Sequence, residues 1–304
     1  MTFSPQRRAL LQLGLSLSWP AAAGPGRVCG VPGTPAAVSF PSADPARDPR
    51  RVYPLELLTL ALRKAGCGLP VEPRQDYAQG RAMAELALGR LDLTMVSHRQ
   101  LPRVRGQVVP VPLRRGLLGL RLLLCLPDRV DELARVQDAG QLKGLALGYG
   151  ADWNDRPVFE QLGYRLVTTS SYAGLFSMLR ARRFDYLSRG LNEVWDELAL
   201  ARRRGSAIAV VPGLALRYPL DDYFVVRPDA PELASLIEQG LVLAQKDGSF
   251  QSLFEQRFGA ALRQADLRAR RLLAVAGYPD DELVQREQDQ LLRKIHALPT
   301  RRAG

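Results

Sequence analysis

Long apolar runs and cysteines are scarce in this chain of 304 residues. No uncharged apolar stretch reaches the ~18–20 residues that a membrane-spanning helix needs. Three cysteines are too few to form the disulfide framework of a chain this long. The apolar content of 46% and the charged content of 24% exclude wholesale disorder. Because single hydrophobic cores rarely grow past ~250–300 residues, we expect one large or two medium domains.

Lysine is also rare, because only four of the 42 basic residues are lysines and the other 38 are arginines. The formal net charge of +11 would suit a nucleic-acid partner, since phosphate neutralisation dominates such binding. The arginines are dispersed, however, and their densest run, residues 202–204, has three members. A solvated arginine-rich surface explains this pattern, and we expect no nucleic-acid partner.

Motifs of catalysis and of metal or cofactor binding are missing as well. No GxSxG, HExxH, CxxC, GxGxxG or P-loop pattern stands in a suitable context. Of the two histidines, His98 follows a predicted strand, where it would face a crevice or solvent, and His296 lies in a polar tail. We expect no catalytic residues, no metal site and no cofactor, which favours a binding protein.

The first 23 residues have the three parts of a secretory signal peptide. Arg7 and Arg8 precede an uncharged apolar segment, residues 9–19, and the alanines at 21–23 provide a cleavage site. The alternative is an amphipathic N-terminal helix of a cytoplasmic protein. We expect export to the periplasm.

Export would place the three cysteines in an oxidising compartment, where two of them could pair. Cys67 follows a predicted helix and Cys125 lies within a predicted apolar strand, whereas Cys29 stands in a Gly/Pro-rich segment. We favour the interpretation that Cys67 and Cys125 are buried thiols that pack as small apolar side chains.

The remaining chain alternates between segments with strand and helix patterning. The predicted helices span residues 54–65, 79–88 (ended by Gly89), 128–142, 152–162, 172–180, 192–201, 231–246 and 249–258. The predicted strands span residues 38–40, 71–73, 91–96, 117–126, 145–148, 165–168, 184–187, 208–211 and 223–226. This alternation predicts an α/β fold with largely parallel sheets, whose ligand sites lie beyond the carboxyl ends of the strands.

Short motifs at four places along the chain point to one family. Residues 86–92 read LALGRLD, residues 142–148 read LKGLALG, and residues 171–176 (SYAGLF) are followed by RFDY at 183–186. Residues 229–241 and the DGSF at 247–250 complete the series. The order of these pieces, over about residues 36–260, resembles the type 2 periplasmic binding proteins, specifically the bacterial extracellular solute-binding protein family 3.

The resemblance implies two lobes, each a largely parallel sheet flanked by helices, joined by two crossing strands that form a hinge. We expect the first lobe at residues 24–120 and 218–304, with a helical tail from about 260, and the second lobe at 121–217. The crossings are expected near 117–124 and 214–223. The resemblance further implies a monomer that closes over a small solute and passes it to an inner-membrane ABC permease, or signals to a membrane sensor.

Two departures from the family's amino-acid receptors bear on the solute. The arginine that holds the ligand's carboxylate corresponds to Arg99, with Arg103 and Arg105 as alternatives. The acidic residue for an ammonium group is replaced by a stretch containing Arg189. Because a guanidinium binds a carboxylate in a directed, bidentate manner, we expect a small polar, carboxylate-bearing solute, either an amino acid or an organic acid.

Each candidate side chain at the cleft has a structural alternative. Tyr53 would stack on the solute or pack into the core, and Trp153 would stack on it or pack under its own helix. Ser171 would contact the solute or cap a helix, and Arg189 would bind it or form a salt bridge with Glu193 or Asp196. The candidate ligand-binding residues are Tyr53, Ser97, Arg99, Asp152, Trp153, Ser171, Arg189 and Asn192.

Two rival functions remain open from the sequence. A dehydratase-like enzyme on the same fold would need a general acid in the cleft, for which Glu193, Asp152 and His98 are available. An orphan sensory module would deliver a ligand signal to a membrane partner without transport.

Overall fold

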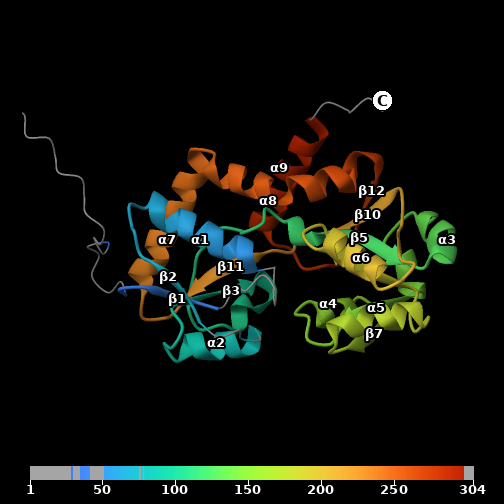
Figure 1. Ribbon diagram of the computed structural model, residues 1–304, viewed down its shortest axis with the longest axis horizontal. Coiled ribbons are helices and arrows are strands. Elements are labelled where there is room, and N and C mark those ends of the chain that lie inside the picture. Colours follow the sequence, from blue (N-terminus) through green and yellow to red (C-terminus); the bar gives the residue numbers. More distant parts are fainter. Residues whose placement is uncertain (1–28, 30–34, 42–50, 75–76, 78, 298–304) are drawn as a thin grey trace, which may run out of the picture.

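The computed structural model describes residues 29, 35–41, 51–74, 77 and 79–297, so the predicted signal peptide at 1–23 lies outside the described residues. Two α/β lobes lie next to each other along the long axis of the molecule (Figure 1). Within the described part of the chain, no helix is long and apolar enough to cross a membrane.

The first lobe contains a sheet in which β11 lies between β3 and β4 and runs antiparallel to both. β1 pairs in parallel with β2 and is tied to the start of β3, because Ser39 donates two hydrogen bonds to the Asp92 carboxylate at 2.8 and 2.7 Å. Helices α1 and α7 pack together on the opposite side of the lobe from α2 (Figure 1). The elements of this lobe are β1 (Val38–Phe40), α1 (Val52–Lys64), β2 (Val71–Pro73), α2 (Gln79–Ala87), β3 (Leu93–Ser97), β4 (Gln107–Val108), β11 (Asp222–Val226), α7 (Pro231–Lys246) and α8 (Ser249–Ala265).

The second lobe contains a larger sheet with the strand order β12-β10-β5-β8-β6-β7, and β9 pairs with β5. β6 runs parallel to β7 and β8, whereas β5 runs antiparallel to its neighbours. The elements are β5 (Leu120–Cys125), α3 (Val130–Ala134), β6 (Ala146–Gly150), α4 (Arg156–Gln161), β7 (Arg165–Thr169), α5 (Tyr172–Arg180), β8 (Tyr186–Gly190), α6 (Val194–Arg203), β9 (Ala209–Val210), β10 (Leu214–Arg217) and β12 (Arg271–Ala274). Short 3-10 helices span His98–Arg103, Leu117–Gly119, Pro127–Arg129, Gln141–Gly144 and Leu267–Ala269.

The long amphipathic helices form where the apolar spacing predicts them. α1 buries Leu57, Leu58 and Ala61 on one face, and this face packs against α7. α2 ends at Ala87, one residue before the predicted end, and Gly89 in the turn that follows has a φ of 68°, the left-handed conformation that glycine adopts without a side-chain clash. Alternation of helices and strands thus produces the α/β fold that the sequence predicts.

Two chain segments cross between the lobes, one leading into β5 and the other leading out of β10, and these strands pair antiparallel. The carboxylate of Asp221 accepts hydrogen bonds from the backbone N–H groups of Arg114, at 3.0 Å, and Gly116, at 2.6 Å. The N–H of Tyr218 donates to the carbonyl of Gly119 at 3.1 Å. These contacts confirm the prediction of two crossing strands and fasten them to each other.

The C-terminal strap, which we define as residues 271–297, contains β12 and α9 (Glu282–Ala297). β12 pairs in parallel with β10, at the edge of the second lobe's sheet. The expectation that every residue from 218 onward belongs to the first lobe is therefore wrong for this strand. The physical reason is that β12 pairs the exposed edge of β10 and buries Leu273 there.

Helix α9 fastens both crossing segments. Gln288 is 1% exposed, and its side-chain amide donates to the backbone carbonyls of Gly116, at 2.9 Å, and Tyr218, at 3.2 Å. The Nε of Arg115 donates to Glu287 at 2.9 Å. The helical tail expected from about residue 260 is interrupted by β12, which lies between α8 and α9, and the position of α9 across the hinge was not predicted.

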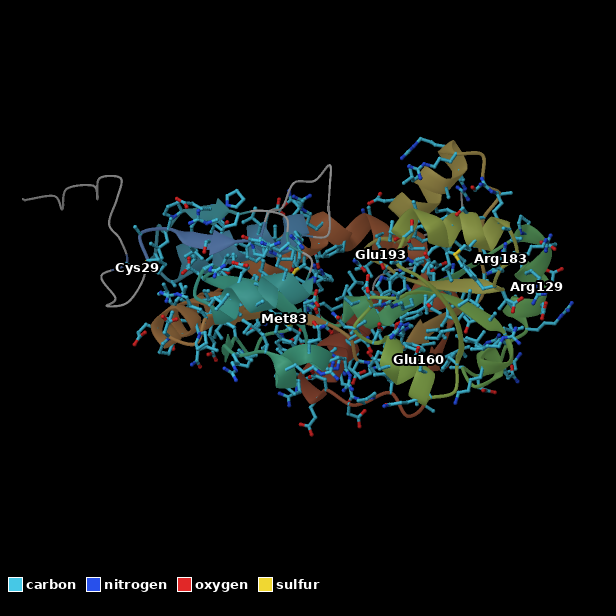
Figure 2. The ribbon with its side chains drawn as sticks, turned by 90° about the horizontal axis from the view of Figure 1, so that it is seen from below. Cys29, Met83, Arg129, Glu160, Arg183 and Glu193 are labelled. Atoms are coloured by element: carbon cyan, nitrogen blue, oxygen red, sulfur yellow. A yellow bond between two sulfur atoms is a disulfide. The ribbon has the colours of Figure 1, made fainter. Side chains whose placement is uncertain are left out.

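The cysteines differ from the prediction at one position. Cys29 and Cys67 form a disulfide with a Cα–Cα distance of 4.9 Å, so the prediction of a free thiol at Cys67 is wrong. Cys67 is buried as expected, but the sequence separation of 38 hides its proximity to Cys29. Cys125 is a buried free cysteine, as predicted. The disulfide lies at the end of the first lobe that is remote from the second, whereas Glu193 lies near the junction of the lobes (Figure 2).

Several predicted elements have other bounds, among them one helix and one strand of the second lobe. In place of the helix at 128–142, only Val130–Ala134 is α-helical, because Asp138 accepts hydrogen bonds from the N–H groups of Gly140 and Gln141, a local turn that competes with the helix. The strand at 184–187 lies further along, at Tyr186–Gly190, so Arg189 is within the strand and does not follow it.

Candidate functional site

A cavity of about 290 Å³ lies between the two lobes, at the lower end of the roughly 300–1,000 Å³ found for small-molecule pockets. Its wall combines the ends of β1, β3 and β8, the loop after β6, and the crossing segments. Among the described residues, its charged lining consists of four arginines and four carboxylates. These are Arg51, Arg114, Arg121, Arg189, Asp152, Asp155, Glu193 and Asp222.

The wall from the first lobe is basic. The side chain of Arg114 is 3% exposed and donates from Nη1 to Asp222 at 2.7 Å. Arg51, which precedes α1, donates from Nη2 to the carbonyl of Tyr77. Both guanidinium groups are therefore held in place by partners before any solute arrives.

Asp221 lies directly behind this wall and is fully buried. Burial raises the pKa of this carboxyl group to about 7, although the Arg114 guanidinium and the N–H of Gly116 act in the opposite direction. Asp221 therefore titrates close to neutral pH, at the point where the chain crosses between the lobes.

The turn after β6 brings Trp153 into the wall from the second lobe. Gly150 ends β6, and a Cβ at this position would overlap the indole of Trp153, so glycine is required for the indole to lie there. The indole contacts the ring of Tyr149 edge-to-face, with 4.7 Å between the centroids. This packing fixes the aromatic surface of the cavity.

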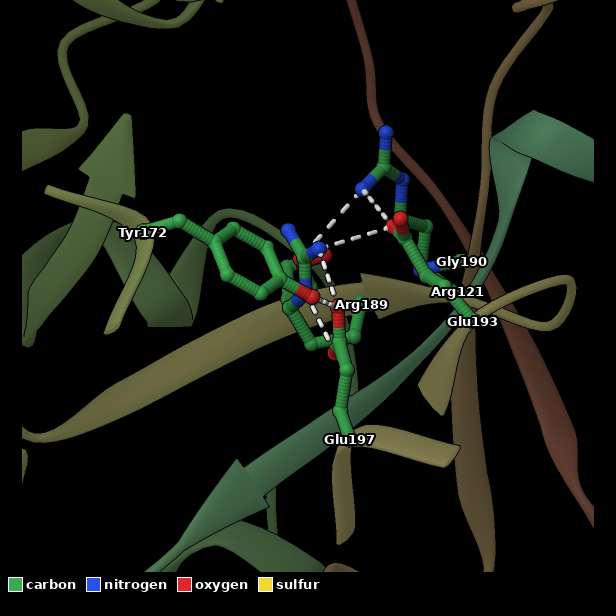
Figure 3. A network of polar contacts seen from close by, with 7 residues as sticks. Arg121, Tyr172, Arg189, Gly190, Glu193 and Glu197 are labelled. Atoms are coloured by element: carbon green, nitrogen blue, oxygen red, sulfur yellow. Dashed lines mark hydrogen bonds and ion pairs between the residues drawn. The ribbon is translucent and has the colours of Figure 1, made fainter. Parts of the chain in front are cut away.

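Arg189 lies at the centre of a buried ionic network (Figure 3). Its Nε and Nη2 donate to the two carboxylate oxygens of Glu197 at 2.8 and 2.5 Å, and Glu193 lies 3.1 Å from Nη2. The guanidinium also lies over the rings of Trp153, at 4.6 Å, and Tyr172, at 5.6 Å. The salt-bridge alternative for Arg189 therefore holds, with Glu197 in place of Asp196.

Arg121 occupies the neighbouring part of the wall on β5. Its Nη1 donates to the carbonyl of Ser188 at 3.3 Å, and Glu193 lies 3.9 Å away. Its guanidinium lies 5.6 Å from the centroid of the Tyr218 ring. Both arginines in this part of the wall, Arg121 and Arg189, thus lie within 4 Å of the Glu193 carboxylate.

Several buried polar atoms of the wall have no hydrogen-bond partner within the described part of the protein. A buried polar group without a partner costs about 1–3 kcal/mol, so such atoms indicate where a polar solute would bind. They are the Oγ of Ser97, the Nε of Arg121, the Oδ2 of Asp155 and the Oδ1 of Asn192.

The predicted residues divide into two groups. Ser97, Asp152, Trp153, Arg189 and Asn192 line the cavity.

The other three candidates lie elsewhere. Tyr53 is 3% exposed and packs on Phe258 at 4.8 Å, so it belongs to the core. The Oγ of Ser171 accepts from the N–H of Gly174 at 3.0 Å and caps α5. Arg99 belongs to the 3-10 helix after β3 and is not part of the cavity wall.

Sequence reasoning missed Arg51, Arg114, Arg121, Asp155 and Asp222. A signal existed for Arg121, because it is a charged residue inside an apolar strand, and for Arg114, which comes just before that strand. Within the residues that the structure describes, no group of three or more His, Cys, Asp and Glu side chains is placed to hold a metal ion.

No protein-family model and no curated protein sequence matches the chain. Among solved structures, an ancestral arginine-binding protein bound to arginine is similar, with 16% identity, a TM-score of 0.50 and coverage of 73% of this chain and 97% of that one. A histidine kinase sensor domain with similarity to periplasmic binding proteins has 19% identity, a TM-score of 0.51 and coverage of 73% and 96%. The substrate-binding protein of an amino acid ABC transporter has 12% identity, a TM-score of 0.50 and coverage of 73% and 99%.

These likenesses establish the fold and confirm the prediction made from the motifs. The chain has the two-lobed α/β fold of the type 2 periplasmic binding proteins.

Proposed function

We propose that the protein is a periplasmic solute-binding protein that captures a small, carboxylate-bearing solute between its lobes by hinge closure. The observation that carries this proposal is the cavity between the lobes, whose lining contains four arginines and four carboxylates. Such a cavity suits a small polar molecule that contacts both lobes, and ligand binding would then favour the closed conformation.

The distribution of charge supports an amino acid over a simple organic acid. On the side of the first lobe, Arg51 and Arg114 outnumber Asp222. On the side of the second lobe, the lining residues Asp152, Asp155 and Glu193 outnumber the two arginines. A zwitterion would place its carboxylate toward the first lobe and its ammonium group toward the second.

A contact across the cleft supports closure as the capture step. Gln100 follows β3 in the first lobe, and its Nε2 donates to the Oδ1 of Asn154 in the second lobe. We assign residues 24–120 and 218 onward to the first lobe and 121–217 to the second, with β12 as the exception noted above. Closing the lobes brings this pair together at the rim of the cavity.

Delivery to an inner-membrane ABC permease fits the similarity to the substrate-binding protein of an amino acid ABC transporter. The similarity to a histidine kinase sensor domain favours a second candidate, a sensory module that reports solute to a membrane partner. The dehydratase-like alternative keeps one free candidate acid among the residues that the structure describes, Asp152 in the cavity lining, because Glu193 is ion-paired with two arginines and His98 does not line the cavity.

Tryptophan fluorescence and thermal shift with a panel of amino acids and organic acids test the proposal. We expect at least one amino acid to raise Tm and to change the emission of Trp153, which lies in the cavity wall. Trp195 is the matched control, because its Nε1 donates to Ala261 at 3.0 Å and it lies outside the wall.

The fluorescence change should therefore disappear in Trp153→Phe and persist in Trp195→Phe. If no member of the panel changes either Tm or fluorescence, the proposal is wrong.

A further inference from the structure

Asp155 is a buried carboxylate that does not cap the helix it precedes. It precedes α4, but the N–H groups of Val158 and Phe159 bond to its backbone carbonyl, at 3.0 and 3.2 Å, and its side chain caps nothing. The residue is 5% exposed and lines the cavity between the lobes. Because the helix does not use the carboxylate, its burial needs another explanation.

The carboxylate of Asp155 also has no full ionic partner. Within the described ranges of the chain, no basic side chain forms an ion pair with it, and its Oδ2 has no hydrogen-bond partner. The nearby cation, Arg121, is already shared between the carbonyl of Ser188 and the carboxylate of Glu193. Leaving a buried carboxylate without a partner is costly, so its position favours a cation.

The charge of Asp155 also acts on two buried tyrosines, Tyr149 and Tyr278, which do not line the cavity. Burial, and then the negative charge of Asp155, raise the pKa of Tyr149 and of Tyr278 well above the usual tyrosine value. Tyr278 belongs to the C-terminal strap and packs on Tyr218, with ring centroids 4.5 Å apart. These hydroxyls stay neutral, so the negative charge at this position comes from Asp155 and not from the tyrosines.

We propose that Asp155 forms a subsite for a second cationic group, at the end of the solute remote from its α-carbon. This inference rests on the proposed function, because it specifies which zwitterions the cavity accepts. The solute would carry its carboxylate toward Arg51 and Arg114 and a side-chain ammonium or guanidinium group toward Asp155. A basic amino acid has this arrangement of charges.

L-lysine and L-norleucine are the probes, because norleucine has the same side chain without the terminal ammonium group. Isothermal titration calorimetry on the full mature protein should give a Kd for L-lysine about tenfold or more below that for L-norleucine, since a buried charge pair contributes strongly to affinity. The same comparison should be made for Asp155→Asn, which keeps the side-chain volume.

Asp155→Asn should weaken lysine binding about tenfold or more and change norleucine binding about threefold at most. Asp196→Asn is the matched control, because it removes the same charge from an exposed position of the same lobe, outside the cavity. It should leave both affinities unchanged. Circular dichroism identifies a variant that fails to fold, and the comparison of the two probes in the wild-type protein stands without any variant.

The outcomes are distinct. Equal affinity of the wild-type protein for the two probes, or unchanged lysine binding by folded Asp155→Asn, would overturn the subsite and leave the solute-binding proposal intact. If neither these probes nor any other amino acid or organic acid binds, both proposals are wrong.

Discussion

Arg189 is a buried cation whose charge is balanced within the second lobe. It is 2% exposed, and the carboxylates of Glu197 and Glu193 lie 2.5 and 3.1 Å from its Nη2. Breaking a buried pair by removing one partner costs about 3–5 kcal/mol, because the other charge is left uncompensated. Loss of binding on replacing Arg189 would therefore report damage to the wall as much as loss of a solute contact.

Asp221 gives a prediction about pH at the same scale. Its pKa of about 7 in the folded protein exceeds the ordinary value of 3.8. The folded state therefore binds more protons between these values, so the stabilisation from the protonated group is present below about pH 4 and is lost as the pH rises through about 7.

The variant Asp221→Asn should lack this dependence. We expect the difference in unfolding free energy between wild type and variant to fall with rising pH, at most by about 1.4 kcal/mol per pH unit. Urea unfolding at several pH values between 4 and 8 measures it. A difference that stays constant or grows over this range would contradict the prediction.

At the scale of elements, capping explains why some candidates for solute binding serve the fold. The Oγ of Ser171 accepts a hydrogen bond from the N–H of Gly174 and caps the N-terminus of α5. Because Ser171 follows β7, the sequence alone also allows it to contact a solute. The side chain is exposed and does not line the cavity. Its role is therefore local to the helix.

The variant Ser171→Ala should lower the unfolding free energy by about 0.5–2 kcal/mol, the usual effect of losing an N-cap. Any solute that binds the wild-type protein should bind the variant with unchanged Kd. Chemical denaturation and calorimetry measure the two quantities. Weaker binding at unchanged stability would show instead that Ser171 contacts the solute.

The elements that could be predicted from the sequence are those that their own residues and immediate neighbours specify. α5 and α7 match their predicted bounds, because apolar spacing and flanking residues specify them. β12 was missed, because four residues carry little periodicity and the strand depends on the edge of β10. The charged wall of the cavity was only partly predicted, since Arg114 and Asp155 reach it through the arrangement of distant segments.

At the scale of the whole molecule, the strap connects the two lobes. β12 belongs to the sheet of the second lobe, while Asp281, just before α9, accepts a hydrogen bond from Tyr223 on β11 of the first lobe at 3.0 Å. A hinge motion of one lobe against the other, as proposed above, would change the distance between these two points of attachment. If the lobes close over a solute as proposed, the strap would restrain that motion.

The variant Gln288→Ala tests this restraint. It leaves the carbonyls of Gly116 and Tyr218 without the bonds at 2.9 and 3.2 Å, and we expect a loss of about 1–3 kcal/mol in unfolding free energy. Small-angle scattering should also report a larger radius of gyration without solute. Gln285→Ala is the control, because its amide bonds only to Asp280 at the exposed surface. Identical behaviour of the two variants would contradict a role for Gln288 in the hinge.

The position of α9 in the chain has a consequence for biosynthesis. Helix α9 follows every element to which it bonds in the chain. The ribosome therefore synthesises those elements before α9 can bind the two crossing segments. During vectorial emergence, the second lobe's stretch from β5 to β10 is synthesised before β11, α7 and α8 of the first lobe, and its edge strand β12 follows them. Docking of α9 would then be the last step of folding and would set the stiffness of the hinge. A chain truncated before α9 would have both lobes but a more mobile hinge between them.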